Sequence, residues 1–315
     1  MKINILMSTY NGEKYLAQQI KSIQDQTLTD WKLLIRDDGS SDRTPQIIKE
    51  FVDIDSRIVF INENDRENFG VIKNFYTLVK HEVADFYCFS DQDDYWLADK
   101  LEIQIEEAVK HPLDCPLMVY MDLKVVDQNL RTIYESMIKS QSGHANTELI
   151  QELSENAVTG GVSLINHALA ERWTRTDRII MHDWYLALLA CALGKLVFID
   201  QPGELYRQHE NNVLGARTLD KRFKILREGP KKIFTRYWEL IHQSQGQAQN
   251  ILDDYSDILS EENKLILKNY VDFDKQPFIK RFQRIVKYRY TKNQLKHIIV
   301  FRLLLLSNIY NVRRK

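Results

Sequence analysis

Short apolar runs alternate with amphipathic stretches over the first two thirds of the chain. A run of about four to eight apolar residues is typical of a buried strand, whereas apolar residues at every third or fourth position predict a helix that faces a core. The predicted strands are residues 3–7, 31–36, 57–61, 86–89, 116–126, 158–166 and 195–199. The predicted helices are residues 15–23, 45–51, 71–83, 97–109 and 185–193. This alternation predicts an α/β fold with a mostly parallel, Rossmann-like sheet.

The pattern becomes wholly helical beyond about residue 220. Apolar residues at helical spacing predict helices at 222–226, 231–255, 261–271, 277–290 and 294–310. The charge changes at the same place: residues 1–219 carry 22 basic and 34 acidic side chains, and residues 220–315 carry 21 and 10. We therefore expect a catalytic or binding domain in residues 1–219, followed by an all-helical, basic region in residues 220–315.

The end of the chain combines positive charge with apolar side chains. From Gln276 onward there are 11 Lys or Arg residues and no Asp or Glu. The closing apolar run, residues 298–310, contains an arginine and is shorter than the roughly 20 residues that span a bilayer. This combination predicts helices that lie on an anionic membrane surface. The alternative is a helix pair that packs on the first domain or in a homodimer interface; nucleic acid is not an expected partner, because no base-reading motif accompanies the charge.

The N-terminus and the cysteines indicate the compartment. The apolar run 3–7 is much shorter than the core of a signal peptide and leads into a polar turn, so no secretion is implied. Cys88, Cys115 and Cys191 have apolar neighbours and no metal-binding spacing, which indicates buried thiols in a reducing cytosol. We expect a cytoplasmic protein that is peripheral at the inner face of the cell membrane.

Three carboxylates, Asp91, Asp93 and Asp94, follow the apolar strand 86–89. Ligands of open α/β sheets bind beyond the carboxyl ends of the strands, so these side chains are placed to face a ligand. Crowded carboxylates repel one another, and a hard cation such as Mg²⁺ or Mn²⁺ removes that repulsion. The alternative is a solvated turn in which Asp94 caps the helix that begins near Leu97.

Polar motifs at other strand ends complete a pattern. The motifs are Ser8-Thr-Tyr-Asn11, Asp37-Asp-Gly-Ser40, Asp91-Gln-Asp-Asp94 and His182-Asp-Trp184. In this order and spacing they resemble the family 2 inverting glycosyltransferases of the GT-A fold, over roughly residues 1–215. A narrower likeness, to the rhamnosyltransferases that build bacterial cell-wall rhamnan, is carried by residues 66–70, 159–161, 182–184 and 206–209.

The resemblance implies a nucleotide-sugar site with a divalent metal, Mn²⁺ or Mg²⁺. Asp93, in the DxD motif, would bind the metal, and His209 would complete the metal shell. Asp91 would contact the ribose or support the metal ligand, with Asp94 in support. The other donor-binding residues that the resemblance implies are Ser8, Thr9, Tyr10, Asp37, Asp38, Lys73, Gln92 and Arg207.

Several of these donor-binding residues also have a specific expected contact. Tyr10 would stack on the base, Asp37 and Asp38 would accept hydrogen bonds from the base and the ribose, and Arg207 would meet the diphosphate. The alternative for Asp37 and Asp38 is a polar turn that caps the next helix, since turns rich in Asp, Gly and Ser are common. The alternative for Lys73 is a surface position on a helix.

The resemblance also assigns Asp183 as the catalytic base. Inverting transfer is a single in-line displacement, which needs a base to take the proton of the acceptor hydroxyl. An N-cap role for the apolar helix that follows is the alternative. The residues implied around the donor sugar and the acceptor are Thr159, Gly160, Gly161, His182 and Trp184. The alternatives here are a strand bulge for the glycines and core packing for Trp184, and equally for Trp96.

The function expected from this resemblance is transfer of L-rhamnose from dTDP-β-L-rhamnose to a lipid-diphosphate-linked saccharide acceptor, with an α-L-rhamnosyl product. Another donor, UDP-glucose or UDP-galactose, is the main alternative. The Gln-x-x-Arg-Trp motif of processive synthases is missing from the sequence, which favours addition of one or a few sugars. A sugar nucleotidyltransferase is disfavoured, because its glycine-rich, lysine-containing N-terminal signature is missing. A non-catalytic nucleotide-binding module is disfavoured because Asp93 and Asp183 are both present.

Overall fold

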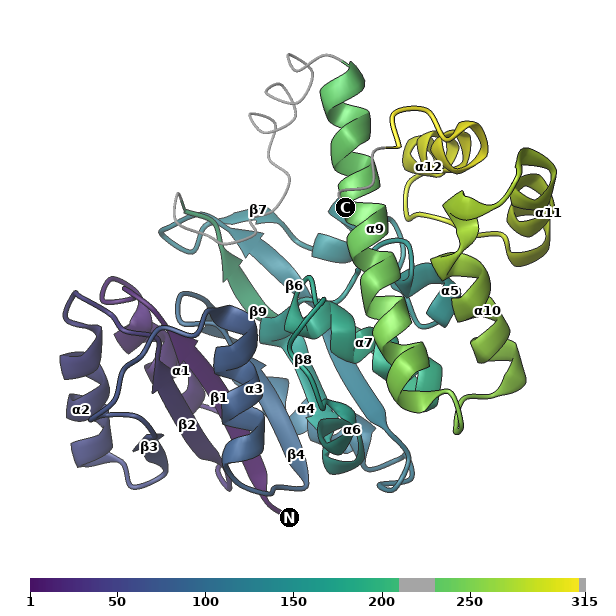
Figure 1. Ribbon diagram of the computed structural model, residues 1–315. Helices are drawn as coiled ribbons and strands as arrows, with labels where there is room; N and C mark the ends of the chain where they lie inside the picture. The colour runs from purple at the N-terminus through teal and green to yellow at the C-terminus, as the bar shows by residue number, and fades with distance from the viewer. Residues whose placement is uncertain (210–229, 312–315) are drawn as a thin grey trace.

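The computed structural model describes residues 1–209 and 230–311, in which a nine-stranded sheet has helices packed around it (Figure 1). The strand order is β3-β2-β1-β4-β8-β6-β9-β5, and β7 pairs with β6 outside this path. The strands are β1 Ile3–Thr9, β2 Lys32–Asp37, β3 Ile58–Phe60, β4 Phe86–Ser90, β5 Tyr95–Trp96, β6 Leu117–Val126, β7 Thr132–Tyr134, β8 Ser163–Asn166 and β9 Lys195–Arg207. The predicted α/β class and mostly parallel sheet are confirmed.

The N-terminal half of the sheet is parallel. Strand β1 pairs with β2 and β4, and β2 pairs with β3, all in parallel. The helices that connect these strands are α1 Leu16–Gln24, α2 Thr44–Ile54 and α3 Val71–His81. Every residue of β4 is buried, as a central strand covered on both faces requires. The carboxyl ends of β1, β2 and β4 therefore lie side by side, and their polar motifs meet at one edge.

The second half of the sheet departs from a purely parallel arrangement. Strand β8 runs antiparallel between β4 and β6, whereas β6 and β9 are parallel. The strand predicted at 158–166 begins only at Ser163, because the two glycines lie in a short 3-10 turn, Gly160–Val162. The helix predicted from Leu97 is α4, Lys100–Ala108. It starts late because β5 pairs with β9 and the amide of Leu97 donates to the carbonyl of Gly203 at 3.0 Å.

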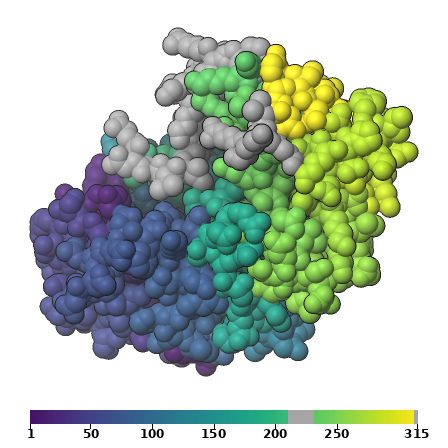
Figure 2. Space-filling view, in the orientation of Figure 1, coloured from purple at the N-terminus to yellow at the C-terminus, as the bar shows by residue number. Residues whose placement is uncertain are grey.

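The C-terminal region is helical, as predicted. Its elements are α9 Pro230–Tyr255, α10 Glu261–Val271, the short turn η3 Phe273–Lys275, α11 Phe278–Tyr288 and α12 Leu295–Ser307. The expected helix 222–226 and the expected boundary at residues 219 and 220 lie outside the described residues. Figure 2 shows these green and yellow helices seated against the teal part of the sheet domain.

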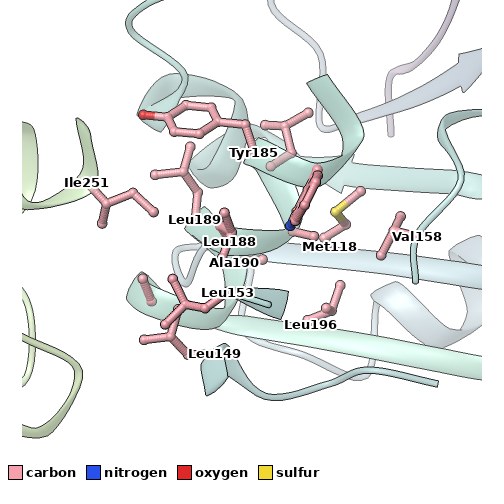
Figure 3. Close-up of a cluster of buried hydrophobic side chains, with 14 of the residues drawn as sticks. Met118, Leu149, Leu153, Val158, Tyr185, Leu188, Leu189, Ala190, Leu196 and Ile251 are labelled. Carbon is pink, nitrogen blue, oxygen red and sulfur yellow. The ribbon is translucent and has the colours of Figure 1, made fainter. Parts of the chain in front are cut away.

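One helix joins the two parts of the chain. Helix α7, His182–Leu193, is apolar on all sides, and residues 182–190 are buried without interruption. Its side chains pack in a cluster with residues of β6, of α5 (Leu149–Glu152) and of α9 (Figure 3). Ile251 of α9 and Leu189 of α7 belong to this cluster, and neither is exposed. The helical region and the sheet domain therefore share a core.

A buried ion pair lies below the carboxyl end of the sheet. The ammonium of Lys100 is 3.6 Å from the carboxylate of Glu204, and neither side chain is exposed. Lys100 also donates to the carbonyl of Gly161 and lies 3.3 Å from the centre of the Trp96 ring. Burial lowers the pKa of Lys100 to about 8 and raises the pKa of Glu204. Each partner compensates a charge that would otherwise be costly in this environment.

We expect Lys100→Met to lower the free energy of unfolding by about 3–5 kcal/mol, because it leaves Glu204 buried without its cation. Adding Glu204→Gln should restore part of that loss, since the second change removes the uncompensated charge. Urea unfolding of the parent, both single variants and the double variant measures the coupling. Strictly additive losses would contradict the pairing.

Candidate active site

The three predicted carboxylates occupy different positions in the loop after β4. Asp94 is buried, and its Oδ1 accepts from the backbone amide of Arg207 at 2.9 Å. The cap position of α4 is taken by Asp99. The alternative in which Asp94 caps a helix near Leu97 is therefore wrong. Asp94 instead ties the acidic loop to the end of β9.

Asp93 and His209, the two residues predicted to bind a metal, contact each other. His209 Nε2 lies 2.7 Å from Asp93 Oδ2, and the imidazole packs against the Tyr15 ring with centroids 5.1 Å apart. The His209 side chain is 13% exposed and the Asp93 side chain is 18% exposed, so solvent reaches both. A carboxylate oxygen beside an imidazole nitrogen is a donor set that suits Mn²⁺, or Mg²⁺ when substrate phosphates supply further ligands.

The protein supplies few ligands in this place. Within residues 1–209 and 230–311, no group of three or more His, Cys, Asp or Glu side chains is arranged to hold a metal ion. The donor set fits a cation that is shared with a substrate rather than one enclosed by the protein. Such sharing is usual for Mg²⁺, which commonly has one or two carboxylates plus phosphate oxygens as ligands.

Mutual repulsion and burial act together on this cluster. Burial raises the pKa of Asp91 well above its usual range, and the charges of Asp93, Glu204 and Asp183 raise it further. The pKa of Asp94 is also raised, by burial and by the charges of neighbouring carboxylates. Sequence reasoning missed Glu204 and its partner Lys100. The available signal was an acidic residue in the apolar strand β9, directly after Gly203.

Arg207 supports the acidic loop from below. Its Nε donates to the carbonyl of Asp93 at 2.7 Å, and its Nη1 and Nη2 donate to Gln128 O at 2.9 Å and to Gln18 Oε1 at 2.7 Å. The guanidinium also lies 4.4 Å from the centre of the Tyr15 ring. The sequence predicts contact with a diphosphate, whereas the structure buries this side chain and directs these three donors to protein acceptors.

Asp37 and Asp38 hold the loop after β2 in place. Asp38 accepts from Arg36 at 2.9 Å, from Phe69 N at 2.7 Å and from Gly70 N at 2.8 Å. Asp37 accepts from the Thr9 hydroxyl at 3.0 Å. Both side chains are buried. In the structure these carboxylates therefore make contacts within the polar turn, as the alternative to base and ribose binding predicts.

The first polar motif presents one aromatic ring to solvent. The Tyr10 side chain is 52% exposed, and Gln92 fixes its backbone by accepting from its amide and donating to its carbonyl, both at 2.9 Å. The Ser8 hydroxyl accepts from Asn74 at 2.7 Å. Lys73 is exposed and lines a separate surface cavity of about 440 Å³ with Phe69 and other residues. The structure therefore brings Tyr10 and Gln92 together and leaves Lys73 apart.

Asp183 lies in the first turn of α7 and lines a cavity of about 480 Å³. Its Oδ2 accepts from the amide of Gly160 at 3.1 Å, and its Oδ1 accepts from the amide of Trp184 at 2.6 Å. Burial raises the pKa of Asp183 to about 7. The cap position of α7 is Met181, so the alternative N-cap role of Asp183 is wrong. A carboxylate that titrates near neutral pH in a cavity is suited to proton transfer.

The residues around Asp183 are closely packed. His182 is buried, with its ring centroid 4.2 Å from that of Phe75, and burial lowers its pKa to about 3. A Cβ added at Gly160 would lie 2.9 Å from His182 Nε2, and one added at Gly161 would lie 2.7 Å from Glu204 Oε1. The two glycines are thus required by neighbouring side chains of the protein itself. Neither lies in a strand, so the strand-bulge alternative for them is wrong.

The two tryptophan candidates, Trp184 and Trp96, are both buried but have different surroundings. Trp184 is 5% exposed, donates from Nε1 to the carbonyl of Glu152 at 2.7 Å, and still lines the Asp183 cavity. Trp96 packs in the core beneath Lys100. Thr159 is half-buried and starts the turn that carries Gly160. A larger cavity of about 840 Å³, between α9 and residues 178–180, contains none of the predicted site residues.

Comparisons with known proteins identify the family and the fold. A family model described as glycosyl transferase family 2 matches residues 4–174. The chain is 32% identical to the dTDP-rhamnosyl transferase RfbG of Shigella flexneri over 223 residues, which is 67% of this chain and 74% of that protein. It is 33% identical to the UDP-Glc:alpha-D-GlcNAc-diphosphoundecaprenol beta-1,3-glucosyltransferase WfgD of Escherichia coli over 127 residues, 40% of this chain and 47% of that protein.

Solved structures share the fold. The crystal structure of S. aureus TarS 1–349 matches with a TM-score of 0.58 and 16% identity, covering 98% of this chain and 82% of that one. The same protein is also solved in complex with UDP-GlcNAc. Since the family model covers more than half of the chain and the sheet has the expected architecture, this protein belongs to glycosyl transferase family 2 and has the GT-A fold.

Proposed function

We propose that this glycosyltransferase moves L-rhamnose from dTDP-β-L-rhamnose to a lipid-diphosphate-linked saccharide with inversion, giving an α-L-rhamnosyl link. The observation that carries the chemistry is Asp183, a carboxylate at the wall of a cavity with a pKa of about 7. The likeness to RfbG supports the donor. The name of WfgD, which includes a diphosphoundecaprenol acceptor, supports the acceptor class.

The base acts on the acceptor hydroxyl. The hydroxyl oxygen attacks the anomeric carbon of the donor as the bond from that carbon to the diphosphate oxygen breaks, and the hydroxyl proton passes to Asp183. The Gly160 and Trp184 amides orient the carboxylate. Burial holds the pKa of Asp183 near the pH at which a general base is most effective. Asp183 thereby serves as the base of a single in-line displacement.

The donor would bind over Asp93 and His209, at the end of the sheet that carries the polar motifs. These two residues would hold the divalent cation together with the donor's phosphates. When bound, the cation supplies positive charge to the leaving diphosphate. The exposed ring of Tyr10 offers a face for the base. A UDP-sugar, such as UDP-glucose or UDP-galactose, is the second candidate, because WfgD is named for UDP-glucose.

We also propose that α11 and α12 dock on the inner face of the cell membrane. Their outer faces carry exposed apolar side chains at helical spacing, with exposures between 52% and 73%. These residues, which we call the docking face, are Phe278, Ile279, Phe282 and Val286 on α11 and Leu295, Ile299 and Leu303 on α12. Exposed apolar patches of this kind mark interaction sites, and the surrounding Lys and Arg residues favour an anionic bilayer.

Surface docking is consistent with how these helices pack. Their inner faces belong to the shared core, where Ile285, Phe301 and Leu305 are buried. No helix in the described part of the chain is long and apolar enough to cross a membrane. The predicted alternative of packing on the first domain therefore describes the inner faces, and membrane contact accounts for the outer ones. A homodimer interface at the docking face is the competing explanation that the membrane experiment below separates.

We expect dTDP to bind more tightly than UDP, and Mn²⁺ to strengthen dTDP binding at least tenfold. Asp93→Asn should remove most of the Mn²⁺ effect, because it takes away one of two protein ligands. Titration calorimetry with and without Mn²⁺ measures both effects, and Asp53→Asn, an exposed acid on α2, is the control. Tighter binding of UDP would overturn the donor assignment, and an unchanged Mn²⁺ effect in Asp93→Asn would overturn the metal assignment.

We expect Asp183→Asn to lose about 10²- to 10⁴-fold in kcat while keeping donor affinity. In the parent protein, kcat/KM should rise with pH through about 7, as Asp183 loses its proton. The control is Asp177→Asn, an exposed acid in the loop before α7. A variant with near-normal turnover, or a parent whose rate does not change between pH 5 and pH 8, would exclude this base.

The same substitution should remove a pH dependence of the stability of the fold. Because the folded-state pKa of Asp183 lies above the ordinary carboxyl value of 3.8, the folded chain binds this proton more tightly than the unfolded chain. The stability contributed by Asp183 is therefore greatest below pH 4 and falls as the pH rises through about 7. Asparagine cannot ionise, so the melting temperature of Asp183→Asn relative to that of the parent should rise as the pH increases from 5 to 8.

We expect Phe282→Glu combined with Leu303→Glu to reduce liposome binding at least tenfold, since burying each large apolar side chain contributes roughly 1.5–3 kcal/mol. Sedimentation with phosphatidylglycerol vesicles measures this, and 1 M salt should weaken parent binding by screening. The matched control is Ile54→Glu with Ile258→Glu, two apolar side chains exposed elsewhere. If the parent instead forms a dimer that the variant abolishes, and binds no vesicles, the docking face is a subunit interface.

A further inference from the structure

We propose that Arg236, Lys292 and His297, three residues of the C-terminal helical region, bind the diphosphate of the acceptor inside the Asp183 cavity. The transferred sugar is then added close to the lipid, on a short saccharide. This inference rests on the proposed function and deepens it, because it says which part of the acceptor the cavity recognises and how long that acceptor is.

The cavity is built from both parts of the chain. Asp183 and Trp184 line it from the sheet domain, and the three basic residues, together with apolar side chains of α9, line it from the C-terminal region. The apolar and aromatic lining residues are Ile180, Met181, Trp184, Ile233, Tyr237 and Leu240. A volume of about 480 Å³ lies toward the small end of the usual range of about 300–1,000 Å³. This volume accommodates a short saccharide headgroup.

One short segment of the chain limits the distance between the base and Lys292. The Lys292 ammonium donates to the carbonyl of Ser154 at 2.5 Å, and the Asn156 amide reaches Asp183 Oδ1 at 3.5 Å. Ser154 and Asn156 are two residues apart, so at most about 7 Å separates their Cα atoms. Lys292 and Asp183 therefore contact positions two residues apart on one segment, and both line the same cavity. A hydroxyl beside Asp183 and a phosphate beside Lys292 can then belong to one acceptor.

The charges in the cavity suit a diphosphate. Lys292 is only 4% exposed and lines the cavity, so its ammonium is placed where an anionic ligand would bind. Arg236 supplies a planar fork for phosphate oxygens, and His297 adds further nitrogen donors. Two carboxylates, Asp183 and Glu155, also line the cavity. Glu155 accepts from the amide of Asn293 at 2.9 Å, so part of its hydrogen-bonding capacity is already used.

The position of these basic residues links the cavity to the membrane. Lys292 lies in the connection between α11 and α12, and His297 lies in the first turn of α12. Helix α12 thus carries the docking residues Leu295 and Ile299 on one side and projects His297 from the other side, toward the cavity. A lipid-linked diphosphate bound by these basic residues would place its sugar toward Asp183. The preceding reaction would then be one that transfers a sugar phosphate to a lipid phosphate, or one that adds few sugars to that product.

The test uses n-decyl diphosphate as a soluble probe, with the full chain in metal-free buffer. Arg236→Gln and Lys292→Met should each weaken probe binding about 10- to 100-fold, because each removes a charge-assisted contact. Lys296→Gln, an exposed neighbour on α12, is the matched control and should bind as the parent does. Because Arg236 is exposed, its variant keeps the test valid even if Lys292→Met fails to fold.

Two further arms separate this inference from the proposed function. Excess dTDP should not displace the probe; displacement would show that the probe occupies the donor site and would overturn the inference. No binding to the parent, or equal binding to Arg236→Gln, would also overturn it. Slow Mn²⁺-dependent hydrolysis of dTDP-rhamnose by the parent, and by the control Lys296→Gln, measures the transferase chemistry separately from probe binding. If the parent turns over no nucleotide sugar at all, the proposed function fails, whatever the probe result.

Discussion

The rest of this site depends on a cluster of carboxylates that lie close enough to repel one another. Asp91, Asp94 and Glu204 each have a raised pKa because burial and mutual repulsion oppose their ionisation. Lys100 and Arg207 hold this arrangement in place, one by charge and the other by hydrogen bonds to the acidic loop. The helix start, the strand pairing of β5 and the end of β9 are all fixed by these contacts. A cation shared with a substrate would relieve the same repulsion from the open side.

Sequence reasoning predicted the placement of the polar motifs more reliably than the contacts of each side chain. Apolar runs that end in polar motifs predicted the sheet edge correctly, because ligand sites follow the carboxyl ends of strands. The contacts of Asp38 and Arg207 could not be predicted, since a short motif does not say where its side chain points. The pairing of Lys100 with Glu204 depends on tertiary structure alone. The direction of β8 was also hidden, because hydrophobic periodicity is the same for parallel and antiparallel strands.

The C-terminal helices show why the sequence predicted both packing on the first domain and binding at a surface. On α11, Arg281 and Ile285 face the protein, whereas Phe282 and Val286 face outward. Neighbouring residues thus lie on opposite faces, one buried and one exposed, and a pattern rich in both apolar and basic residues predicts packing and surface binding equally well. Only the exposure of individual side chains assigns each face. The arrangement keeps these helices packed on the domain that carries Asp183, and the Asp183 cavity is lined by residues of both.

Helix α7 has a consequence for how this chain is made. Its apolar surface is buried partly against α9, which emerges from the ribosome well after α7 has been synthesised. At about 5–20 residues per second, the nascent chain spends seconds with that surface uncovered. The sheet domain is therefore at risk of aggregation during translation until α9 docks, and changes that slow synthesis between α7 and α9 should lower the yield of folded protein. The apolar surface of the nascent chain is fully covered only when this core is complete, which is later than completion of the sheet.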